Sequence, residues 1–198
     1  MLFAGRLQLS PTRLRNAKEL IMKSLRLVLA VVLVSMATVA LAQSDAQKSF
    51  DNLKALAGTW HGSVTVTPPH PEWGNEPVWV SMRVTSRGNL LVHEMKKPGT
   101  PDDISKDDPI TTVYLDQGQL TLTHYCDAGN RPRMTAKTSP DGKRIEFDFL
   151  DVAGSTQYGH MHHAVFTIID DNHHTEEWTF MEPGDKMVHA LIDLKKAN

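Results

Sequence analysis

The sequence predicts an all-β fold, an antiparallel up-and-down barrel of about ten strands with one short N-terminal helix. Two observations support it: ten short runs alternate apolar with polar residues, and turn-forming residues fill most of the gaps between them. Short gaps favour hairpins, and a meander of this size usually closes into a barrel to remove its edges. A Greek-key sandwich is the alternative, but it needs longer connections than most of these gaps provide.

The helix is expected from Asp45, a capping residue, to about Leu56, with Phe50, Leu53 and Leu56 at helical spacing. The strands follow it. They are expected at residues 59–67, 78–86, 89–97, 110–116, 119–126, 132–139, 144–150, 160–170, 174–181 and 187–194. Between them, residues 98–109 are rich in proline and acidic side chains and are expected to form a solvated loop near a rim of the barrel.

The first 42 residues are expected to lie outside this barrel. Residues 27–42 form the apolar run LVLAVVLVSMATVALA, which ends in Ala-Leu-Ala and follows Lys23 and Arg26. These features predict a secretory signal peptide that is cleaved after residue 42. A membrane anchor is the alternative, but the run is shorter than the about 18 to 20 apolar residues that a span needs. Met22 is itself a normal start, which makes residues 1–21 a candidate over-extended start.

Residues 43–198 are expected to form a single domain, exported to the periplasm or secreted, with no stable membrane anchor once the signal is cleaved. The chain has 21 basic and 23 acidic side chains, of which six and one precede residue 43, so this domain carries 15 against 22, a net charge of −7. That charge argues against nucleic acid and anionic lipid as partners. Cys126 is the only cysteine, which leaves a buried thiol, an intermolecular bridge or a ligand as its roles.

Alternation along the strands predicts which side chains face the interior. In the run 119–126, Leu120 and Leu122 define the apolar face, and the same parity turns His124 and Cys126 inward. The next strand places Met134 on this face by the same rule.

The hairpin of the runs 160–170 and 174–181 is expected to have a three-residue loop, residues 171–173, that pairs Phe166 with Trp178. The same register turns three polar residues inward: His160, His162 and Glu176. The predicted ligand-binding residues are therefore His124, Cys126, Met134, His162, Phe166, Glu176 and Trp178.

Polar groups cost about 1 to 3 kcal/mol each to bury unless they find partners. Three interpretations satisfy this requirement: a self-satisfied polar network in a filled structural or interaction barrel, a pocket that binds a small apolar or amphipathic ligand, and a metal or haem site. The pocket interpretation expects an open cavity lined by Val80, Met82, Leu122, Met134, Phe147, Phe166 and Trp178.

All ten histidines of the chain lie after residue 43, which keeps zinc, copper or haem among the candidate cofactors. The candidate metal ligands are His124, His160, His162 and His189. His173 and His174 are expected to be exposed residues at a hairpin tip.

The sequence offers little support for an enzyme. Cys126 and His124 stand side by side on one strand without a third orienting group. Glu176 and Glu177 are neighbours on a strand, so they face opposite ways and cannot form a carboxylate dyad. The sequence contains no phosphate-cradling glycine loop, nucleophile elbow or metalloprotease motif.

The segment LKALAGTWHGSVTV, residues 53–66, resembles the entry segment of lipocalin-like calycin barrels, which include fatty-acid-binding proteins and the haem-binding nitrobindins. The segments THYCDAGNRPRM, residues 123–134, and HMHHAVFTIIDDNHHTEEWTF, residues 160–180, are similar to uncharacterised secreted bacterial proteins of this lipocalin-like kind. The resemblance implies the barrel fold and no activity. Nitrobindins ligate haem through a histidine near the C-terminus, and His189 is at a comparable place, although its flanking residues do not match well.

Overall fold

The computed structural model describes residue 20 and residues 22–29, 45–71, 74, 76–98 and 108–197. The chain divides into two compact units, Met1–Ala42 and Gln43–Asn198. Among the described residues, no helix is long and apolar enough to span a membrane. Most of residues 1–42 and most of the loop 98–109 lie outside the described residues, so the expected signal peptide, start and loop stay predictions.

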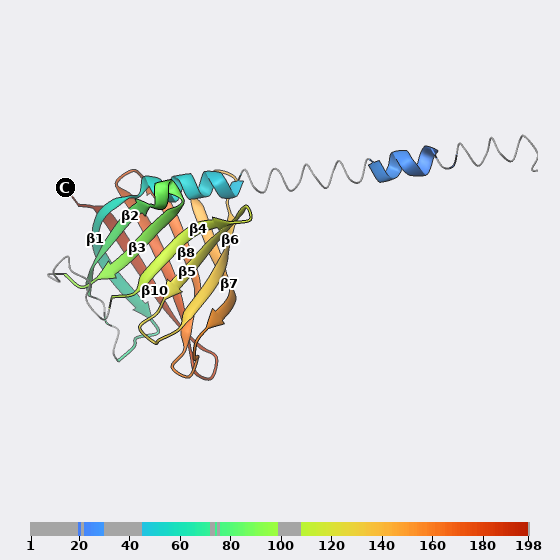
Figure 1. Cartoon of the computed structure of the whole chain (residues 1–198). Helices are drawn as coiled ribbons and strands as arrows, with labels where there is room; N and C mark the ends of the chain where they lie inside the picture. The colour runs from blue at the N-terminus through green and yellow to red at the C-terminus, as the bar shows by residue number, and fades with distance from the viewer. Residues whose placement is uncertain are drawn as a thin grey trace, which may run out of the picture. The chain divides into compact units, whose positions relative to one another are not determined.

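Ten antiparallel strands form a closed barrel in which each strand pairs with the next one along the chain and β1 pairs with β10 (Figure 1). They are β1 (Gly58–Thr67), β2 (Pro77–Thr85), β3 (Leu90–Lys96), β4 (Ile110–Asp116), β5 (Gln119–Tyr125), β6 (Arg131–Thr138), β7 (Arg144–Ala153), β8 (His160–Asp170), β9 (His173–Glu182) and β10 (Lys186–Lys196). The predicted up-and-down barrel is confirmed. Closure pairs the first strand with the last and leaves the sheet no free edge.

Gly62 allows the closing strands to approach each other. It pairs with Leu194 across the β1–β10 seam, and a Cβ atom at this position would collide with the carbonyl oxygen of Asp193. Any larger residue would clash, so glycine is needed here. Glycine within a strand often marks such a close approach of another backbone.

A helix at residues 45–55 lies over one end of the barrel (Figure 1). Its apolar face contributes Phe50 and Leu53 to the core, both almost fully buried. Trp60 Nε1 donates a hydrogen bond to the carbonyl oxygen of Leu56, at 2.8 Å, which fixes the turn between helix and β1. On the other side, Asn52 Nδ2 donates to the carbonyl oxygen of Gly142, at 3.0 Å. The helix thus closes this end of the barrel.

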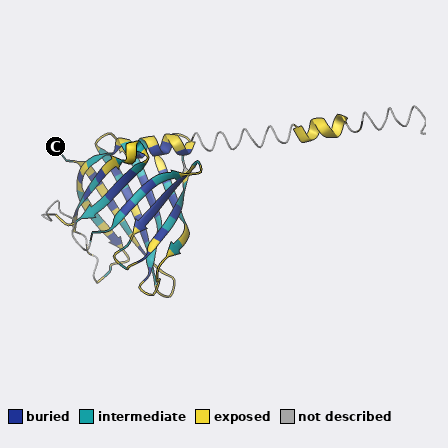
Figure 2. Ribbon diagram, viewed as in Figure 1, coloured by how far each residue is buried: buried dark blue, intermediate teal, exposed yellow. Residues whose placement is uncertain are grey.

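The half of the barrel beneath this helix is filled. Buried positions alternate with exposed ones along the strands (Figure 2). Six of the side chains expected to line an open cavity are instead packed in the core, each at most 2% exposed: Val80, Met82, Leu122, Met134, Phe147 and Phe166. The structure confirms that these six side chains point inward. The prediction that they line an open cavity is wrong. Packing to the density of protein interiors leaves no room there for a ligand.

The β8–β9 hairpin differs from the prediction in its register. Asp170 pairs with His173, so the loop has two residues, and Phe166 pairs with Glu176 rather than with Trp178. The observed partner of Phe166 is two positions from the predicted one. A shift of two positions leaves each side chain on its predicted face, so Glu176 and Trp178 stay inside. A β-bulge between Met161 and His163 then shifts the parity near the start of β8.

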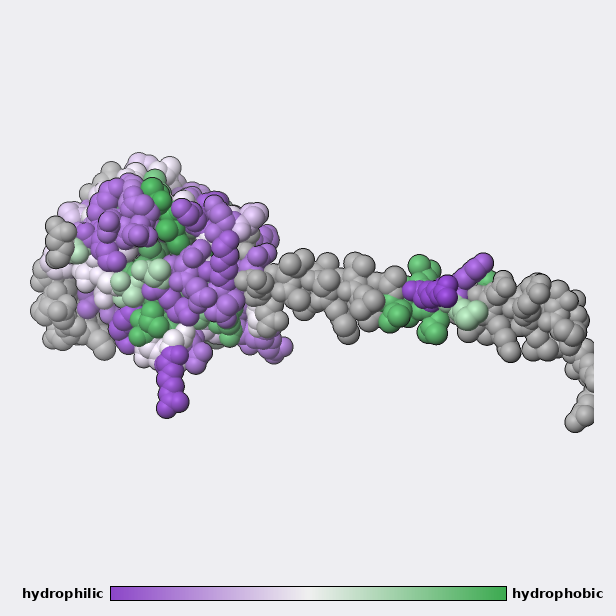
Figure 3. Space-filling model, turned by 90° about the horizontal axis from the view of Figure 1, so that it is seen from above, coloured by the Kyte–Doolittle hydropathy of each residue, from purple (hydrophilic) through white to green (hydrophobic). Residues whose placement is uncertain are grey.

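Seen from above, the helix-covered end of the barrel is mostly hydrophilic, with hydrophobic residues between the polar ones (Figure 3). Exposed large apolar side chains include Tyr125, Leu150 and Leu191. They come from different strands, as scattered apolar residues on soluble surfaces commonly do.

Candidate functional site

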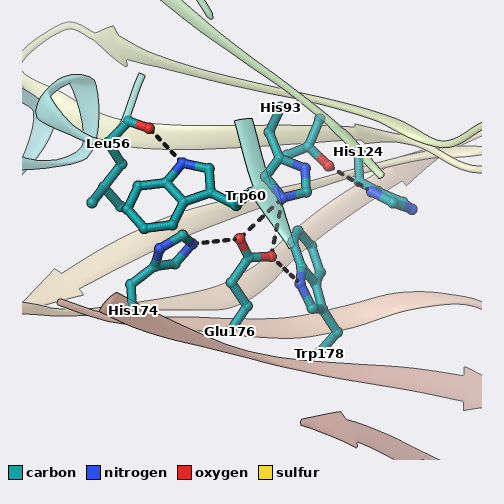
Figure 4. Close-up of polar contacts among 8 residues, drawn as sticks. Leu56, Trp60, His93, His124, His174, Glu176 and Trp178 are labelled. Carbon is teal, nitrogen blue, oxygen red and sulfur yellow. Dashed lines mark hydrogen bonds and ion pairs between the residues drawn. The ribbon is translucent and has the colours of Figure 1, made fainter. Parts of the chain in front are cut away.

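A buried carboxylate marks the boundary between the filled and the open half of the barrel. Glu176 on β9 is fully buried, and three side chains hydrogen-bond to its oxygens (Figure 4). His93 Nε2 lies 3.0 Å from Oε2, His174 Nε2 lies 3.1 Å from Oε1, and Trp178 Nε1 lies 2.9 Å from Oε2. The carboxylate therefore joins β3 to β9 through the interior.

The hydrogen bonds keep Glu176 ionised and determine which ring nitrogen of each histidine faces it. Burial alone would raise the pKa of Glu176, but the facing His93 and His174 rings outweigh it and hold this pKa well below its usual range. An ionised carboxylate only accepts hydrogen bonds, so both imidazoles donate from Nε2. Their Nδ1 atoms are buried and have no hydrogen-bond partner among the described residues.

A second histidine lies beside this centre. Thr111 on β4 pairs with His124 on β5, and the Thr111 Oγ1 atom lies 2.8 Å from His124 Nδ1. Burial, and then repulsion from His93, lower the pKa of His124 from 6.5 to about 4, so the ring is neutral at neutral pH. The rings of His93 and His124 both contact Trp178, with centroids 5.8 and 5.6 Å from that of the indole.

Above this layer the barrel holds a cavity of about 580 Å³, in the half away from the helix. Its walls are largely apolar, and His93, Thr111 and His124 lie on its floor. The apolar lining is Val64, Val66, Pro77, Val78, Met95, Pro109, Met161, Trp178, Phe180, Val188, Ala190 and Ile192. Charged residues also line it: Glu76, Lys96, Lys97, Asp108 and Asp127.

The structure brings together only part of the predicted ligand-binding set. His124 and Trp178 line the cavity, and Glu176 holds Trp178 and the floor residue His93 from beneath. Met134 and Phe166 are packed in the core. The bulge in β8 brings Met161, rather than His162, to the cavity.

Cys126 lies just past the end of β5, in the turn before β6, and is partly exposed rather than buried inside a strand. It still lines the cavity, with Sγ 3.4 Å from Asp127 Oδ1. Burial is the main cause that raises the pKa of its thiol to about 11. β5 therefore ends one residue before the predicted strand does, while the inward direction predicted for Cys126 agrees with its place in the cavity lining.

The four candidate metal ligands lie at three separate places. His124 is on the cavity floor, whereas His160 and His162 contact the Phe149 ring and lie 3.3 Å apart, from Nε2 to Nδ1. His189 faces outward between Val188 and Ala190, exposed, with Nδ1 3.0 Å from Thr179 Oγ1. Among the described residues, three metal-ligating side chains converge at Glu146, Asp148 and His163, where Arg144 and Lys137 already pair with the carboxylates.

Three residues of the site were missed or misplaced from the sequence. His93 lies two positions after Leu91 and two before Met95, so alternation along the strand places it inside. Thr111 is the residue of β4 that pairs with His124 on β5. His174 was expected to be exposed, but it is fully buried and contacts the Trp60 ring edge-on at 4.3 Å between centroids. His174 lies two positions before Glu176 and therefore on the same inward face of β9. The two-residue loop places it within the strand rather than at the tip of the hairpin.

Comparison with known proteins supports the architecture. No family model matches the sequence, and no curated protein matches it. The solved structure of Rv2717c from M. tuberculosis is similar over 76% of this chain and 98% of that chain, with a TM-score of 0.52 and 14% sequence identity. The fold is lipocalin-like.

Two further solved structures share a weaker similarity with this lipocalin-like barrel. One is a protein of unknown function from the DUF3598 family of Nostoc punctiforme, with a TM-score of 0.49 and 9% identity over 73% of this chain and 48% of that one. The other is the S-type phycobiliprotein lyase CPES from Guillardia theta, with a TM-score of 0.48 and 8% identity over 75% of this chain and 92% of that one.

Proposed function

We propose that this lipocalin-like barrel binds a small apolar or amphipathic molecule in its open half. The cavity of about 580 Å³ is the observation that carries this proposal. Small-molecule sites typically measure about 300 to 1,000 Å³, with apolar walls and a few convergent polar groups. The walls of Val64, Val188 and Ile192 above a floor of His93 and His124 match that description.

The contrast between the two halves of the barrel supports binding over a purely structural role. Beneath the carboxylate, side chains such as Phe147 and Phe166 fill the interior. Above it, the inward positions of the neighbouring strands β1 and β10 hold Val64, Val188 and Ala190, which are too small to reach the opposite wall of the barrel. Protein interiors are otherwise close-packed, so a void of this size favours an occupant.

We further propose that the protein binds its ligand outside the cytoplasm, in the periplasm or after secretion. The apolar run at residues 27–42, with its basic flank and small-residue end, supports export. The test is the mass of the chain recovered from cells. A chain that begins at Gln43 and lies outside the cytoplasm is the expected result, and an uncleaved chain in the cytoplasm would contradict it.

Cavity binding can be tested with prodan, an uncharged naphthalene dye whose emission reports the polarity around it. Residues 43–198, a compact unit with its own core, would be titrated with the dye. A blue shift that saturates at one dye per chain is expected, because the dye leaves water for the apolar walls.

A matched pair of variants would place the dye. Ala190 lines the cavity, whereas the next residue, Leu191, faces outward and is 48% exposed. Ala190→Phe should narrow the cavity and weaken prodan binding at least tenfold, and Leu191→Phe should leave binding unchanged. The proposal fails if the wild-type chain does not bind the dye, or if Ala190→Phe binds it like the wild type while remaining folded.

A further inference from the structure

We propose that the cavity selects ligands whose inner end is an uncharged hydrogen-bond acceptor, such as a ketone, aldehyde or ester carbonyl, and that His124 Nε2–H donates to this acceptor. The inference rests on the proposed function, because it names the chemistry of the ligand in the same cavity. Three properties of the floor carry it: the tautomer of His124, the direction of its ring and the charges around it.

Thr111 determines the tautomer of His124. The Thr111 side chain is almost fully buried, and among the described residues its hydroxyl has one hydrogen-bonding partner, His124 Nδ1 at 2.8 Å. A hydroxyl can both donate and accept, but here its hydrogen reaches no other acceptor. Donation from Thr111 Oγ1 to Nδ1 satisfies both groups, whereas the opposite direction leaves the hydroxyl hydrogen unpaired at a cost of about 1 to 3 kcal/mol. The proton of the neutral ring is therefore on Nε2.

The ring presents that proton to the cavity. His124 lines the cavity, and Figure 4 shows its ring directed away from the group around Glu176. Among the described residues, Nε2 has no hydrogen-bond acceptor, and the side chain is only 4% exposed. This N–H opens on the cavity rather than being fully enclosed, so it pairs there with water or with an acceptor on a bound ligand.

The charges at the floor exclude an anionic end group. The ring of His124 is neutral because burial and repulsion from His93 lower its pKa to about 4. Two carboxylates act near the floor: Asp127, which lines the cavity, and Glu176 beneath it, which pairs with the floor residue His93 and accepts hydrogen bonds from three side chains. The lysines of the lining, Lys96 and Lys97, come from the end of β3 and the residue that follows it, beyond His93. A carboxylate at the floor would therefore meet a second carboxylate and no lysine, whereas a carbonyl oxygen meets one N–H.

Three naphthalenes of similar size test this selectivity: 2-acetylnaphthalene, 2-ethylnaphthalene and 2-naphthoate. Isothermal titration at pH 7.5 would compare their dissociation constants for residues 43–198, as wild type and as His124→Phe. In the wild type, 2-acetylnaphthalene should bind at least tenfold more tightly than 2-naphthoate. His124→Phe should reduce the preference for the acetyl over the ethyl compound by about two- to tenfold, the range that one hydrogen bond provides.

A second measurement does not depend on that variant. Nitrogen-15 NMR of the histidine rings should show His124 protonated at Nε2 in the free protein, and its Nε2–H signal should shift with 2-acetylnaphthalene but not with 2-ethylnaphthalene. The inference is overturned if His124 carries its proton on Nδ1, if 2-naphthoate binds most tightly, or if His124→Phe leaves the acetyl preference unchanged. If none of the three compounds binds, the proposed function fails, and the inference fails with it.

Discussion

His93 and Glu176 meet across the interior of the barrel, with 3.0 Å between His93 Nε2 and Glu176 Oε2, although their strands β3 and β9 are not neighbours in the sheet. The contact joins residues that are 83 positions apart in the sequence. Because both side chains are almost fully buried, water does not weaken their interaction. The pair supports the cavity floor from beneath and marks where the packed core ends.

Glu176→Gln is expected to destabilise the protein. An amide replaces one acceptor oxygen with an NH₂ group, which then faces an imidazole N–H or the Trp178 indole N–H. Losing the charge and leaving a buried donor unpaired should lower the free energy of unfolding by about 2 to 4 kcal/mol, as measured by urea denaturation. The adjacent Glu177 faces outward with Arg144 at 3.7 Å, so Glu177→Gln should change it by less than about 0.5 kcal/mol. Equal effects of the two variants would refute the structural role assigned to Glu176.

The pKa of His124 predicts an acid-sensitive stability. Its folded pKa of about 4 is below the ordinary 6.5, so the unfolded chain takes up the proton first as the pH falls. Stability should therefore decrease between about pH 6.5 and about pH 4, by about 3 kcal/mol in total, and this contribution should be constant below that range. Glu176, with its lowered pKa, adds a loss of the same sign only below about pH 4.5.

Urea denaturation at pH 7.0 and pH 5.0 would measure the effect of His124. The wild type should lose about 2 kcal/mol over this interval, and His124→Phe should lose clearly less. His160 also has a pKa that is lowered, by burial and then by His162, so His160→Asn is the comparison variant for a contribution from outside the cavity. An unchanged pH dependence in His124→Phe would contradict the assigned pKa.

Cys126 should react slowly with thiol reagents in the folded protein. Its pKa of about 11, against 9.0 for an ordinary cysteine, leaves about a hundredfold less thiolate at pH 8. A disulfide reagent should therefore modify Cys126 about a hundred times faster in 6 M urea than in buffer. Because Cys126 lines the cavity, saturating prodan should slow the reaction in buffer further. Equal rates in buffer and urea would show that the thiol is not shielded as described.

Much of the fold could be predicted from the sequence because its signals are local. Alternation of period two and turn residues located all ten strands, and the apolar spacing of Phe50 and Leu53 located the helix. The start of β8 was harder, because the bulge between Met161 and His163 depends on pairing with β9, which no local pattern determines. A shift of one position there turns Met161, instead of His162, toward the cavity.

The site was predicted only in part, since it depends on which end of the barrel is filled. Parity placed His124, Glu176 and Trp178 inside correctly. It could not show that the helix closes one end, which buries Phe166 in the core and His174 beneath Trp60. Nor could it bring His93 to Glu176, because that contact crosses the barrel between strands that share no hydrogen bonds.

The helix over the closed end should stabilise the barrel through Leu53. This side chain is fully buried in the same core cluster as Trp60 and Ile145 of the strands. Leu53→Ala leaves a cavity that the surrounding strands cannot collapse to fill, and it should lower the free energy of unfolding by about 2 to 4 kcal/mol. Leu191→Ala, on the outer face, should change it by less than about 0.5 kcal/mol.

Prodan affinity should survive Leu53→Ala under folded conditions, because the cavity lies on the far side of the Glu176 layer. Loss of dye binding in this variant would show that the two halves of the barrel do not behave independently.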